Sequence, residues 1–287
     1  MAPQAPIILV DNVFDRINLY PLAVLAAPVG SVVGREPQYA ADYRRERTYW
    51  QASAASTGNY VSSDLGGGNT SLIDTVWIDR GHNLWGADIR IYSSNLDVNV
   101  GGVVFDATEF AVPAQGTVGG DPTVGWCVTE EGALYCFASG HIARRFHTLY
   151  VVTSLQPTIT GLIMGKRVQL SSPAGWSSVR DEDAGERSER MEASLVPGYE
   201  GYDRTYSARS MALKLAYIGA TEYDATIRGL RRTLFDVNQP AVMCYNYGTN
   251  PERAWLFRYR GKNWSSPMQK AYRTWSGDFF EVGPLVR

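Results

Sequence analysis

The sequence predicts a mainly β fold, in which a β-sandwich is followed by a smaller α+β domain of β-sandwich-plus-helix type. Aromatic residues make up 12% of the chain, and its 28 glycines are spread between short apolar segments. Many of these segments alternate apolar with polar residues, which is the period of a half-buried strand. The chain of 287 residues is long enough for two domains, each with its own core.

The first 172 residues are read as one sandwich domain because short strand patterns follow one another with regular breaks at Gly, Asn, Pro and Asp. The clearest pair is Leu72 to Asp79 and Ala87 to Tyr92, separated by a Gly- and Asn-containing turn. The other expected strands are Ile7 to Val10, Leu22 to Ala26, Gly102 to Phe105, Gly125 to Val128, Ala133 to Phe137, Thr148 to Thr153 and Thr158 to Met164.

Residues 173–203 are rich in Ser, Gly and charge, and we expect a linker or an exposed arm there. Residues 204–287 form the predicted α+β domain, which opens with a strand from Tyr206 to Ile218. Thr221 is the expected N-cap of a helix that ends before Gln239-Pro240. Ile227, Leu230 and Leu234 recur at helical spacing, and the remaining sequence predicts a strand pair and a closing hairpin.

The formal net charge is −2, so no global basic field favours nucleic acid or an anionic membrane, and neither partner is expected. The N-terminal apolar run has no basic residues ahead of it, so we expect no signal peptide. No apolar run is long enough to predict a transmembrane helix. A binding surface must therefore be local.

Catalytic and metal-binding patterns are weak. Three histidines, without a G-x-S-x-G elbow, do not indicate a Ser/His/Asp set, even though Ser139 lies two residues before His141. The three cysteines have no metal-ligand spacing, so they are read as buried thiols or, for Cys127 and Cys136, as a possible pair. We expect no enzyme, no catalytic residue, no metal and no cofactor.

Two oxygen-rich alternatives stay open. A glycosidase pair of carboxylates leaves no spacing signature in a sequence, and its candidates are Asp74, Asp79, Asp88 and Asp106. The second alternative concerns the loop "DLGGGNTS". It is not read as a phosphate-binding loop, because it lacks the lysine of that motif and leads into a strand instead of a helix. Its Asp64 and Asn69 are weak candidates for calcium ligation.

Four segments in order resemble the discoidin-like, galactose-binding-like jelly roll: "NVFDR" with "PLAVLAA", "YRRERTYWQASAAS", "SLIDTVWIDRGHNLWGADIRIYSS" and "ARRFHTLYVVTS" with "ITGLIMGKRVQL". The resemblance covers residues 1 to about 172. It implies that the Trp50 ring is a core lid whose indole N–H meets a backbone carbonyl. The matching positions are Trp50, Trp77, Asp79, Ile89, Ile91, Arg145, Ile163 and Gly165.

The whole chain resembles phage virion structural proteins, with a second half similar to modules of tail tube and distal tail proteins. That resemblance implies a structural component of a phage tail or baseplate, made in the host cytoplasm, which forms homo-oligomers and contacts other virion proteins. The expected interface residues are Arg258, Tyr259, Arg260, Lys262 and Trp264.

The alternative is a carbohydrate-binding module that adsorbs to a host-surface glycan. This function would need aromatic side chains exposed at loop tips, where a sugar can stack on them. Tyr60, Trp85 and Trp126 are the candidates.

Overall fold

The computed structural model describes residues 7–15, 19–21, 23–27, 30–41, 48–56, 58–97, 105–115, 117, 126–129, 132–152, 156–169, 176–180, 185–192, 200–208, 210–236, 239–244, 254–259, 268–269, 272–281 and 285–286. The chain divides into two compact units. The first contains Met1–Pro173 and Ala241–Leu256, and the second contains Ala174–Pro240 and Phe257–Arg287. None of the helices in the part of the chain that the structure describes is both long and apolar enough to cross a membrane.

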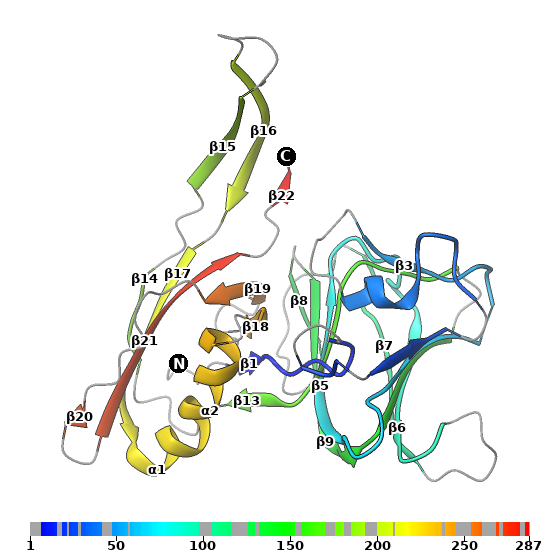
Figure 1. The fold of residues 1–287 in the computed structure, drawn as a ribbon, viewed down its shortest axis with the longest axis horizontal. Helices are drawn as coiled ribbons and strands as arrows, with labels where there is room; N and C mark the ends of the chain where they lie inside the picture. Colours follow the sequence, from blue (N-terminus) through cyan, green and yellow to red (C-terminus); the bar gives the residue numbers. More distant parts are fainter. Residues whose placement is uncertain are drawn as a thin grey trace. The chain divides into compact units, whose positions relative to one another are not determined.

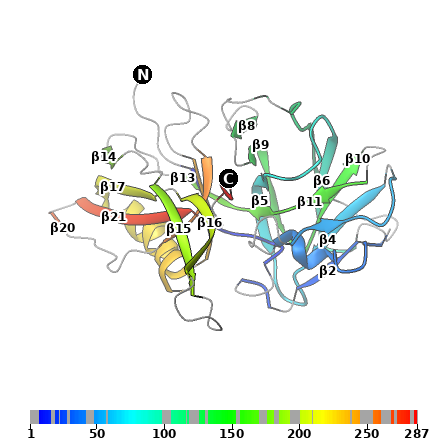
Figure 2. The ribbon, with the colours of Figure 1, turned by 90° about the horizontal axis from the view of Figure 1, so that it is seen from above.

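Two antiparallel sheets form the sandwich of the first unit (Figures 1 and 2). The larger has the strand order β2-β4-β10-β6-β7 and the smaller the order β12-β5-β9-β8. The bounds in the larger sheet are β2 Val24–Ala26, β4 Asn59–Asp64, β10 Phe146–Val152, β6 Asp88–Ser94 and β7 Phe105–Ala111. Those in the smaller sheet are β12 Leu162–Gly165, β5 Ser71–Asp79, β9 Gly132–Arg144 and β8 Trp126–Thr129.

The core between these sheets follows the alternation of the strands. Ile89, Ile91 and Leu149 come from the larger sheet, Val76 and Ile78 come from the smaller one, and all five are fully buried. Successive side chains of a strand point to opposite faces, so each strand contributes every second residue to this core. The predicted fold class, mainly β with a β-sandwich in the first part, is confirmed.

Trp77 lies between Val76 and Ile78 and therefore faces away from that core. The sequence predicts that one of Trp77 and Ile78 points into the core and the other outward. Both side chains are fully buried, because the outer face of the smaller sheet is also covered. Leu134 and Ile163, the register partners of Trp77, are buried on the same face.

Three further strands complete the first unit's pairing around the sandwich. β1 (Ile7–Leu9) pairs on one side with β13 (Arg167–Gln169) and on the other with β18 (Ala241–Cys244). The β1–β18 pairing corrects the predicted domain boundary, because residues 241–256 belong to the first unit and not to the second. A short strand pair, β3 (Trp50–Gln51) with β11 (Thr158–Ile159), and the short helix η1 (Pro37–Ala41) lie in the same unit.

Trp50 is fully buried, as the jelly-roll resemblance implies, but its hydrogen-bond partner differs from the prediction. The indole N–H donates to the hydroxyl oxygen of Ser31 at 3.0 Å and not to a backbone carbonyl. The cysteines Cys127, Cys136 and Cys244 are buried thiols that form no disulfide, so the alternative of a disulfide between the first two is wrong. Across the strand pair, Cys127 lies opposite Leu134, two residues away from Cys136.

The second unit contains an antiparallel sheet in which β17 pairs with both β14 and β21, and β21 also pairs with β20 and with residues 257–259 of β19. A second sheet has the order β15-β16-β22. Trp275 and Phe279 of β21 are fully buried, with ring centroids 6.0 Å apart. The bounds are β14 Trp176–Arg180, β15 Gly185–Glu192, β16 Glu200–Ala208, β17 Ser210–Gly219, β19 Ala254–Tyr259, β20 Met268–Gln269, β21 Tyr272–Glu281 and β22 Leu285–Val286.

These strands change two expectations for the chain's second half. The segment 173–203, expected to be a linker or an exposed arm, contains β14, β15 and the beginning of β16. The expected closing hairpin is wrong, because β21 pairs with β17 while β22 pairs with β16. Long-range pairing, which the local sequence does not encode, decides the second outcome, whereas β15 and β16 form a local hairpin.

A helical segment follows β17. It consists of α1 (Ala220–Glu222), a π-helical turn η3 (Tyr223–Ile227), α2 (Arg228–Leu230) and a second π-helical turn η4 (Arg231–Asp236). The predicted buried face is confirmed, since Ile227, Leu230 and Leu234 are all buried. The predicted cap is wrong: the helix begins at Ala220, Gly219 is the N-cap, and no side chain caps it.

Candidate functional site

The outer face of the larger sheet carries the even-numbered side chains of β4, β6 and β10, because the odd-numbered ones fill the core. Pairing places these side chains in rows that cross the strands. One row reads Tyr60, Tyr150, Arg90 and Glu109, and the next contains Ser62, Thr148, Tyr92 and Ala107. We call this surface the outer face.

Three tyrosines meet on the outer face, and we call them the tyrosine cluster: Tyr60, Tyr92 and Tyr150. The rings of Tyr60 and Tyr150 stack with centroids 4.5 Å apart and an interplanar angle of 29°. Tyr92 meets Tyr150 edge to face at 5.4 Å and 77°. Both arrangements are favourable for aromatic pairs, so neighbouring strands hold the cluster in a defined geometry.

The tyrosines differ in exposure. Tyr60 is 5% exposed, whereas Tyr92 and Tyr150 are partly exposed. Burial raises the pKa of Tyr150 to about 12, and Tyr60, Tyr92 and Asp97 add to the shift. Tyr150 therefore keeps its phenolic proton, as a hydrogen-bond donor, throughout the physiological pH range.

Two ion pairs lie on the same sheet as the cluster. Arg90, next to Tyr150 in its row, pairs with Glu109, its register partner on β7, with 3.0 Å between Nε and Oε1. Farther along β4, beyond the row of Ser62, Arg145 holds Asp64 in a two-pronged contact, with 2.6 Å from Nε to Oδ1 and 2.8 Å from Nη2 to Oδ2. Arg145 also lies over the ring of Phe146, 4.8 Å from its centroid.

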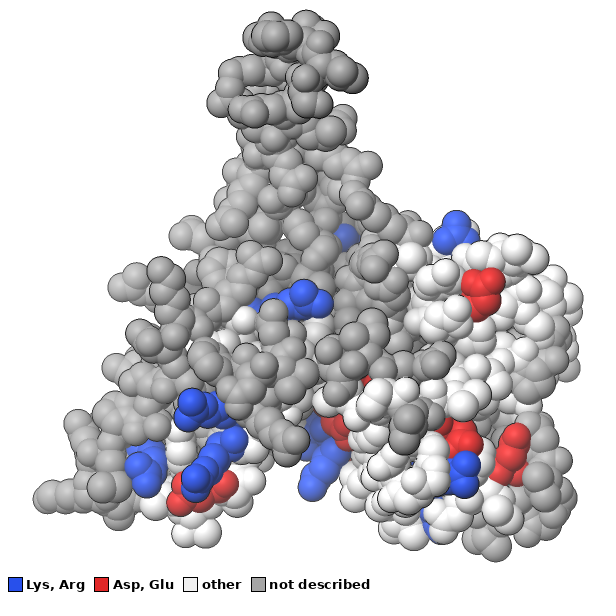
Figure 3. All heavy atoms as spheres, in the orientation of Figure 1, with Lys and Arg blue, Asp and Glu red and all other residues white. Residues whose placement is uncertain are grey.

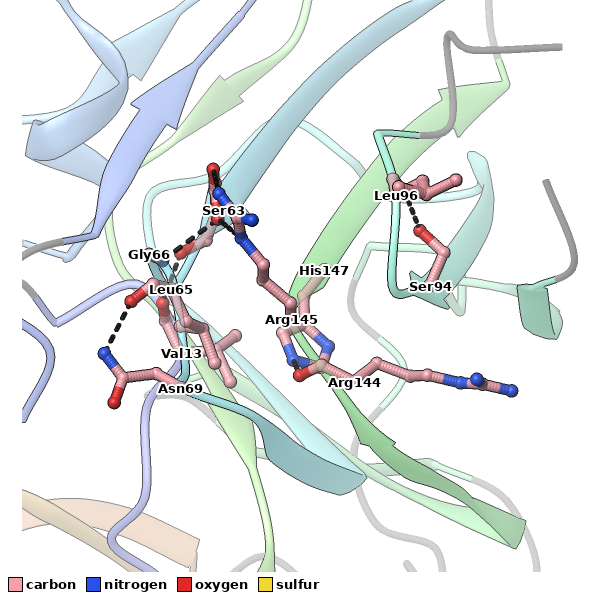
Figure 4. A network of polar contacts seen from close by, with 11 residues as sticks. Val13, Ser63, Leu65, Gly66, Asn69, Ser94, Leu96, Arg144, Arg145 and His147 are labelled. Atoms are coloured by element: carbon pink, nitrogen blue, oxygen red, sulfur yellow. Dashed lines mark hydrogen bonds and ion pairs between the residues drawn. The ribbon is translucent and has the colours of Figure 1, made fainter.

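The Arg145 contact is part of a wider polar network (Figure 4). The hydrogen bond from Arg145 lowers the pKa of Asp64, which keeps this carboxylate charged. Asp64 also accepts the backbone N–H of Gly66 at 2.9 Å, and the amide of Asn69 donates to the carbonyl of Leu65 at 3.0 Å. Asp64 and Asn69, the weak calcium candidates, thus stabilise the turn after β4.

Of the three predicted sugar-stacking residues, only Tyr60 belongs to the tyrosine cluster, and it lies within a strand and not at a loop tip. Trp85 lies in the turn before β6, partly buried against the core, with its ring 4.2 Å from the ring of His82. Trp126 begins β8 and packs against Phe110 and Tyr135, with centroid distances of 5.0 and 5.1 Å. The structure does not bring Tyr60, Trp85 and Trp126 together on one platform, because the latter two contribute to the sandwich core.

The expected interface residues fall partly outside the described residues. Arg260, Lys262 and Trp264 are among those not described, whereas Arg258 is partly buried on β19. Tyr259 is 4% exposed, and its ring packs edge to face against Phe279 at 5.6 Å. Tyr259 is therefore a core residue of the second unit and corrects the expectation of an exposed anchor.

Two of the four carboxylates considered for glycoside hydrolysis accept hydrogen bonds from arginine residues. Asp106 accepts a hydrogen bond from Arg144 at 3.2 Å, and Asp74 accepts one from the backbone N–H of Arg167 at 2.7 Å. Asp79 is buried on β5, and Asp88 is exposed on β6. Within the described ranges, no group of three or more His, Cys, Asp or Glu side chains could hold a metal ion.

The histidines lie away from the outer face, within the body of the sandwich or under a turn. His82, His141 and His147 are all buried. Ser139 is exposed, and the serine that contacts His141 is Ser93 on β6. The sequence neighbour of a histidine is therefore not its partner in the fold.

Sequence reasoning missed Tyr92 and Tyr150. A signal existed in the alternation of "IRIYSS" and "HTLYVV", which puts each tyrosine on the polar side of a predicted strand. What the sequence did not contain was the pairing of β10 between β4 and β6, which brings the tyrosines side by side.

No family model matches the chain, and no curated protein matches it. Solved structures similar to it include the family 32 CBM from C. perfringens NanJ, in complex with galactose, at 14% identity and a TM-score of 0.35, covering 51% of this chain and 93% of that one. Chitosan-binding module 2 of a chitosanase/glucanase from Paenibacillus sp. IK-5, with chitotriose, has 16% identity and a TM-score of 0.35, covering 50% and 95%.

A third is CBM32-1 from a family 31 glycoside hydrolase of Clostridium perfringens, at 15% identity and a TM-score of 0.35, covering 52% of this chain and 98% of that one. At these TM-scores the likeness carries no inference about ligand or mechanism. Any function must be argued from the outer face itself.

Proposed function

We propose that this protein is a carbohydrate-binding protein that uses the outer face, as an adsorption module for a surface glycan. The observation that carries the proposal is the tyrosine cluster, three tyrosines on three adjacent strands, with the Arg90–Glu109 ion pair beside it and the Arg145–Asp64 ion pair farther along β4. Ligand sites combine apolar or aromatic surface with a few precisely placed polar groups, and the outer face has both.

A sugar has apolar C–H groups and polar hydroxyl groups, and the outer face has aromatic rings for the first and charged side chains for the second. A tyrosine ring offers an apolar surface to the C–H groups of a sugar and a hydroxyl at its edge. Arg90 and Arg145 each have further N–H donors, and Asp64 and Glu109 have acceptor oxygens, which can bond to sugar hydroxyls. Since each arginine is already paired with a carboxylate, the contacts suit hydroxyl groups better than anionic groups.

Affinity measurements on a glycan array, followed by calorimetry with the best ligand, test the proposal. Tyr92→Ala removes a partly exposed ring and should weaken binding at least about tenfold, as for a central aromatic contact. Tyr49→Ala is the matched control, because Tyr49 is a partly exposed tyrosine outside the tyrosine cluster, beneath Arg35. Unchanged affinity in Tyr92→Ala, with loss in Trp85→Ala or Trp126→Ala, would move the site to the residues that the sequence predicts.

We propose assembly as a second candidate function: a phage tail or baseplate component that forms homo-oligomers and contacts other virion proteins. Two observations in the second unit support it. β15 is an edge strand of its three-stranded sheet, and strand edges are templates for pairing with another chain. Acidic and basic side chains also lie together on the helical segment, where Asp224, Arg228 and Arg231 are exposed (Figure 3).

Light scattering across a concentration series separates the two functions. Self-association with a blank glycan array would favour assembly. A monomer at all concentrations that binds a defined glycan would favour carbohydrate binding and contradict homo-oligomeric assembly.

A further inference from the structure

A chain of buried polar contacts crosses the sandwich beneath the outer face. The hydroxyl of Ser93 lies 2.7 Å from Nδ1 of His141 and 3.0 Å from Nδ1 of His147. Nε2 of His141 lies 2.8 Å from the hydroxyl of Thr108, and Nε2 of His147 lies 3.0 Å from the carbonyl oxygen of Arg144. The contacts join β6, β7, β9 and β10, so they tie strands of both sheets together.

The acceptor at one end determines where every proton lies. A carbonyl oxygen can only accept, so Nε2 of His147 carries its proton, and Nδ1 of the neutral ring is then an acceptor. The Ser93 hydroxyl must donate to that Nδ1. Its one proton is thereby used, so Nδ1 of His141 must donate to the Ser93 oxygen. Nε2 of His141 is left as an acceptor and receives the proton of the Thr108 hydroxyl.

The surroundings favour neutral rings. Ser93 and His147 are fully buried, and His141 is 3% exposed. Asp106 of β7 and Arg144 of β9 are the nearby charged groups, and they pair with each other at 3.2 Å. Ser63 of β4 and Ile73 of β5 are the other register neighbours of the two histidines, and neither is charged.

We propose that His141 and His147 are held as opposite neutral tautomers, with the proton on Nδ1 of His141 and on Nε2 of His147, and that the Thr108–His141–Ser93–His147 chain is an acid-sensitive latch between the two sheets. With both rings neutral, one direction of donation satisfies the entire chain, and with both rings charged no arrangement does, because the Ser93 hydroxyl then has no acceptor. The proposal rests on hydrogen-bond geometry and does not depend on carbohydrate binding.

The two rings respond differently to a first proton. When His141 gains a proton on Nε2, the Thr108 hydroxyl can rotate and accept, so no contact is lost, and Asp106 favours the new charge. When His147 gains one on Nδ1 and His141 keeps its tautomer, that nitrogen and the Ser93 hydroxyl present two protons to each other, and Ser93 loses its acceptor. The contact is restored only if the His141 proton moves from Nδ1 to Nε2, so that Nδ1 accepts from Ser93. Acid therefore charges His141 first, and the second proton, on His147, opens the latch.

Burial lowers the pKa of each ring from 6.5 to about 4. Because the folded-state pKa lies below the unfolded one, the contribution of each ring to stability is fully present above pH 6.5 and is lost as pH falls toward 4. Each ring should raise the unfolding equilibrium constant by up to about tenfold per pH unit in this window. Burial also lowers the pKa of His82 to about 4, so this ring adds a similar pH dependence of stability although it does not belong to the latch.

Long-range ¹H–¹⁵N NMR of the imidazoles in the ¹⁵N-labelled full-length chain tests the proposal, and with three histidines the spectrum is simple. At pH 7 we expect one ring protonated on Nδ1 and two on Nε2. The third ring is His82, whose Nδ1 accepts the backbone N–H of Leu84 at 3.0 Å. His82→Gln should remove one Nε2-protonated ring.

Thr108→Val identifies His141, because it removes the donor to Nε2 of that ring alone and lies on the edge strand β7. The imidazole signals that shift in Thr108→Val should be those of the ring protonated on Nδ1. Finding that ring protonated on Nε2, or His147 protonated on Nδ1, would overturn the assignment. On titration both rings should stay neutral above about pH 5, and a midpoint near 6.5 for either would overturn the latch even if the variants fail to fold.

Discussion

Trp126 and Ala111 join the two sheets of the sandwich at an open edge. Trp126 begins β8 at the edge of the smaller sheet, and Ala111 ends β7 at the edge of the larger one. The indole N–H of Trp126 donates to the carbonyl oxygen of Ala111 at 2.8 Å, and its ring packs against Phe110 and Tyr135. A residue that suits sugar stacking by type is used here to close the sandwich.

Trp126→Phe should lower the free energy of unfolding by about 1 kcal/mol, since it removes one hydrogen bond and leaves an aromatic ring in place. Trp126→Ala also removes the contacts with Phe110 and Tyr135 and should cost about 2–3 kcal/mol. Urea unfolding followed by circular dichroism measures both. Equal stability of wild type and Trp126→Ala would contradict a closing role and leave the ring available to a ligand.

Gly165 ends β12 where the chain passes close to Asp11. A Cβ at Gly165 would collide with the carbonyl oxygen of Asp11, so Gly165→Ala should destabilise the fold by more than about 2 kcal/mol. Gly67→Ala is the matched control, because nothing lies within 4 Å of its Cβ, and its effect should stay within about 0.5 kcal/mol. Thermal unfolding of the two variants measures this difference. Similar melting temperatures would show that the backbone at Asp11 can move aside.

Ser31 is the hydrogen-bond partner of a fully buried indole. Ser31→Ala leaves the N–H of Trp50 without its 3.0 Å acceptor and should cost about 1–3 kcal/mol, as expected for an unpaired buried donor. Ser139→Ala, at an exposed position of β9, serves as the control and should be nearly neutral. A neutral Ser31→Ala would mean that the indole finds another acceptor.

Asp64 should contribute stability that depends on pH. Its folded-state pKa is held below the ordinary 3.8 by Arg145, so this contribution is present above about pH 4 and is lost as pH falls through the folded-state pKa. Asp64→Asn should therefore unfold at lower urea than wild type at pH 7, with the difference shrinking toward pH 3. Urea midpoints of wild type and Asp64→Asn at pH 7, 5 and 3 check this. If the difference between the two midpoints does not change with pH, the loss of stability comes from the hydrogen bond to Gly66 in the turn and not from the ion pair.

Local sequence patterns predict where the strands lie better than they predict which strands pair. Leu72 to Asp79 appears as β5 and Ala87 to Tyr92 as most of β6, because each strand alternates between a core face and an opposite face. Trp50–Gln51 and Asn59–Asp64 lack such a clear alternation and were not predicted as strands. The cap at Thr221 was wrong because the helix continues from the end of β17 without a capping side chain.

The tyrosine cluster shows the same limit for the candidate site. The sequence singled out Tyr60 and two tryptophans by residue type, but the tryptophans are partly buried against the core. Tyr92 and Tyr150 join Tyr60 only because β10 pairs with both β4 and β6. Selecting candidate residues by amino-acid type alone cannot predict this strand pairing.

The sequence by itself determined the mainly β class, the alternation that assigns each strand a core face, and the helical face of Ile227, Leu230 and Leu234. These properties depend on the period of side chains along a strand or a helix, which is local. Only the tertiary structure decided that Arg145 meets Asp64, that Ser93 joins two histidines, and that Ala241–Cys244 pairs with Ile7–Leu9. Such contacts depend on which distant strands pair, and that choice is made by burial over the whole core and not by any one segment.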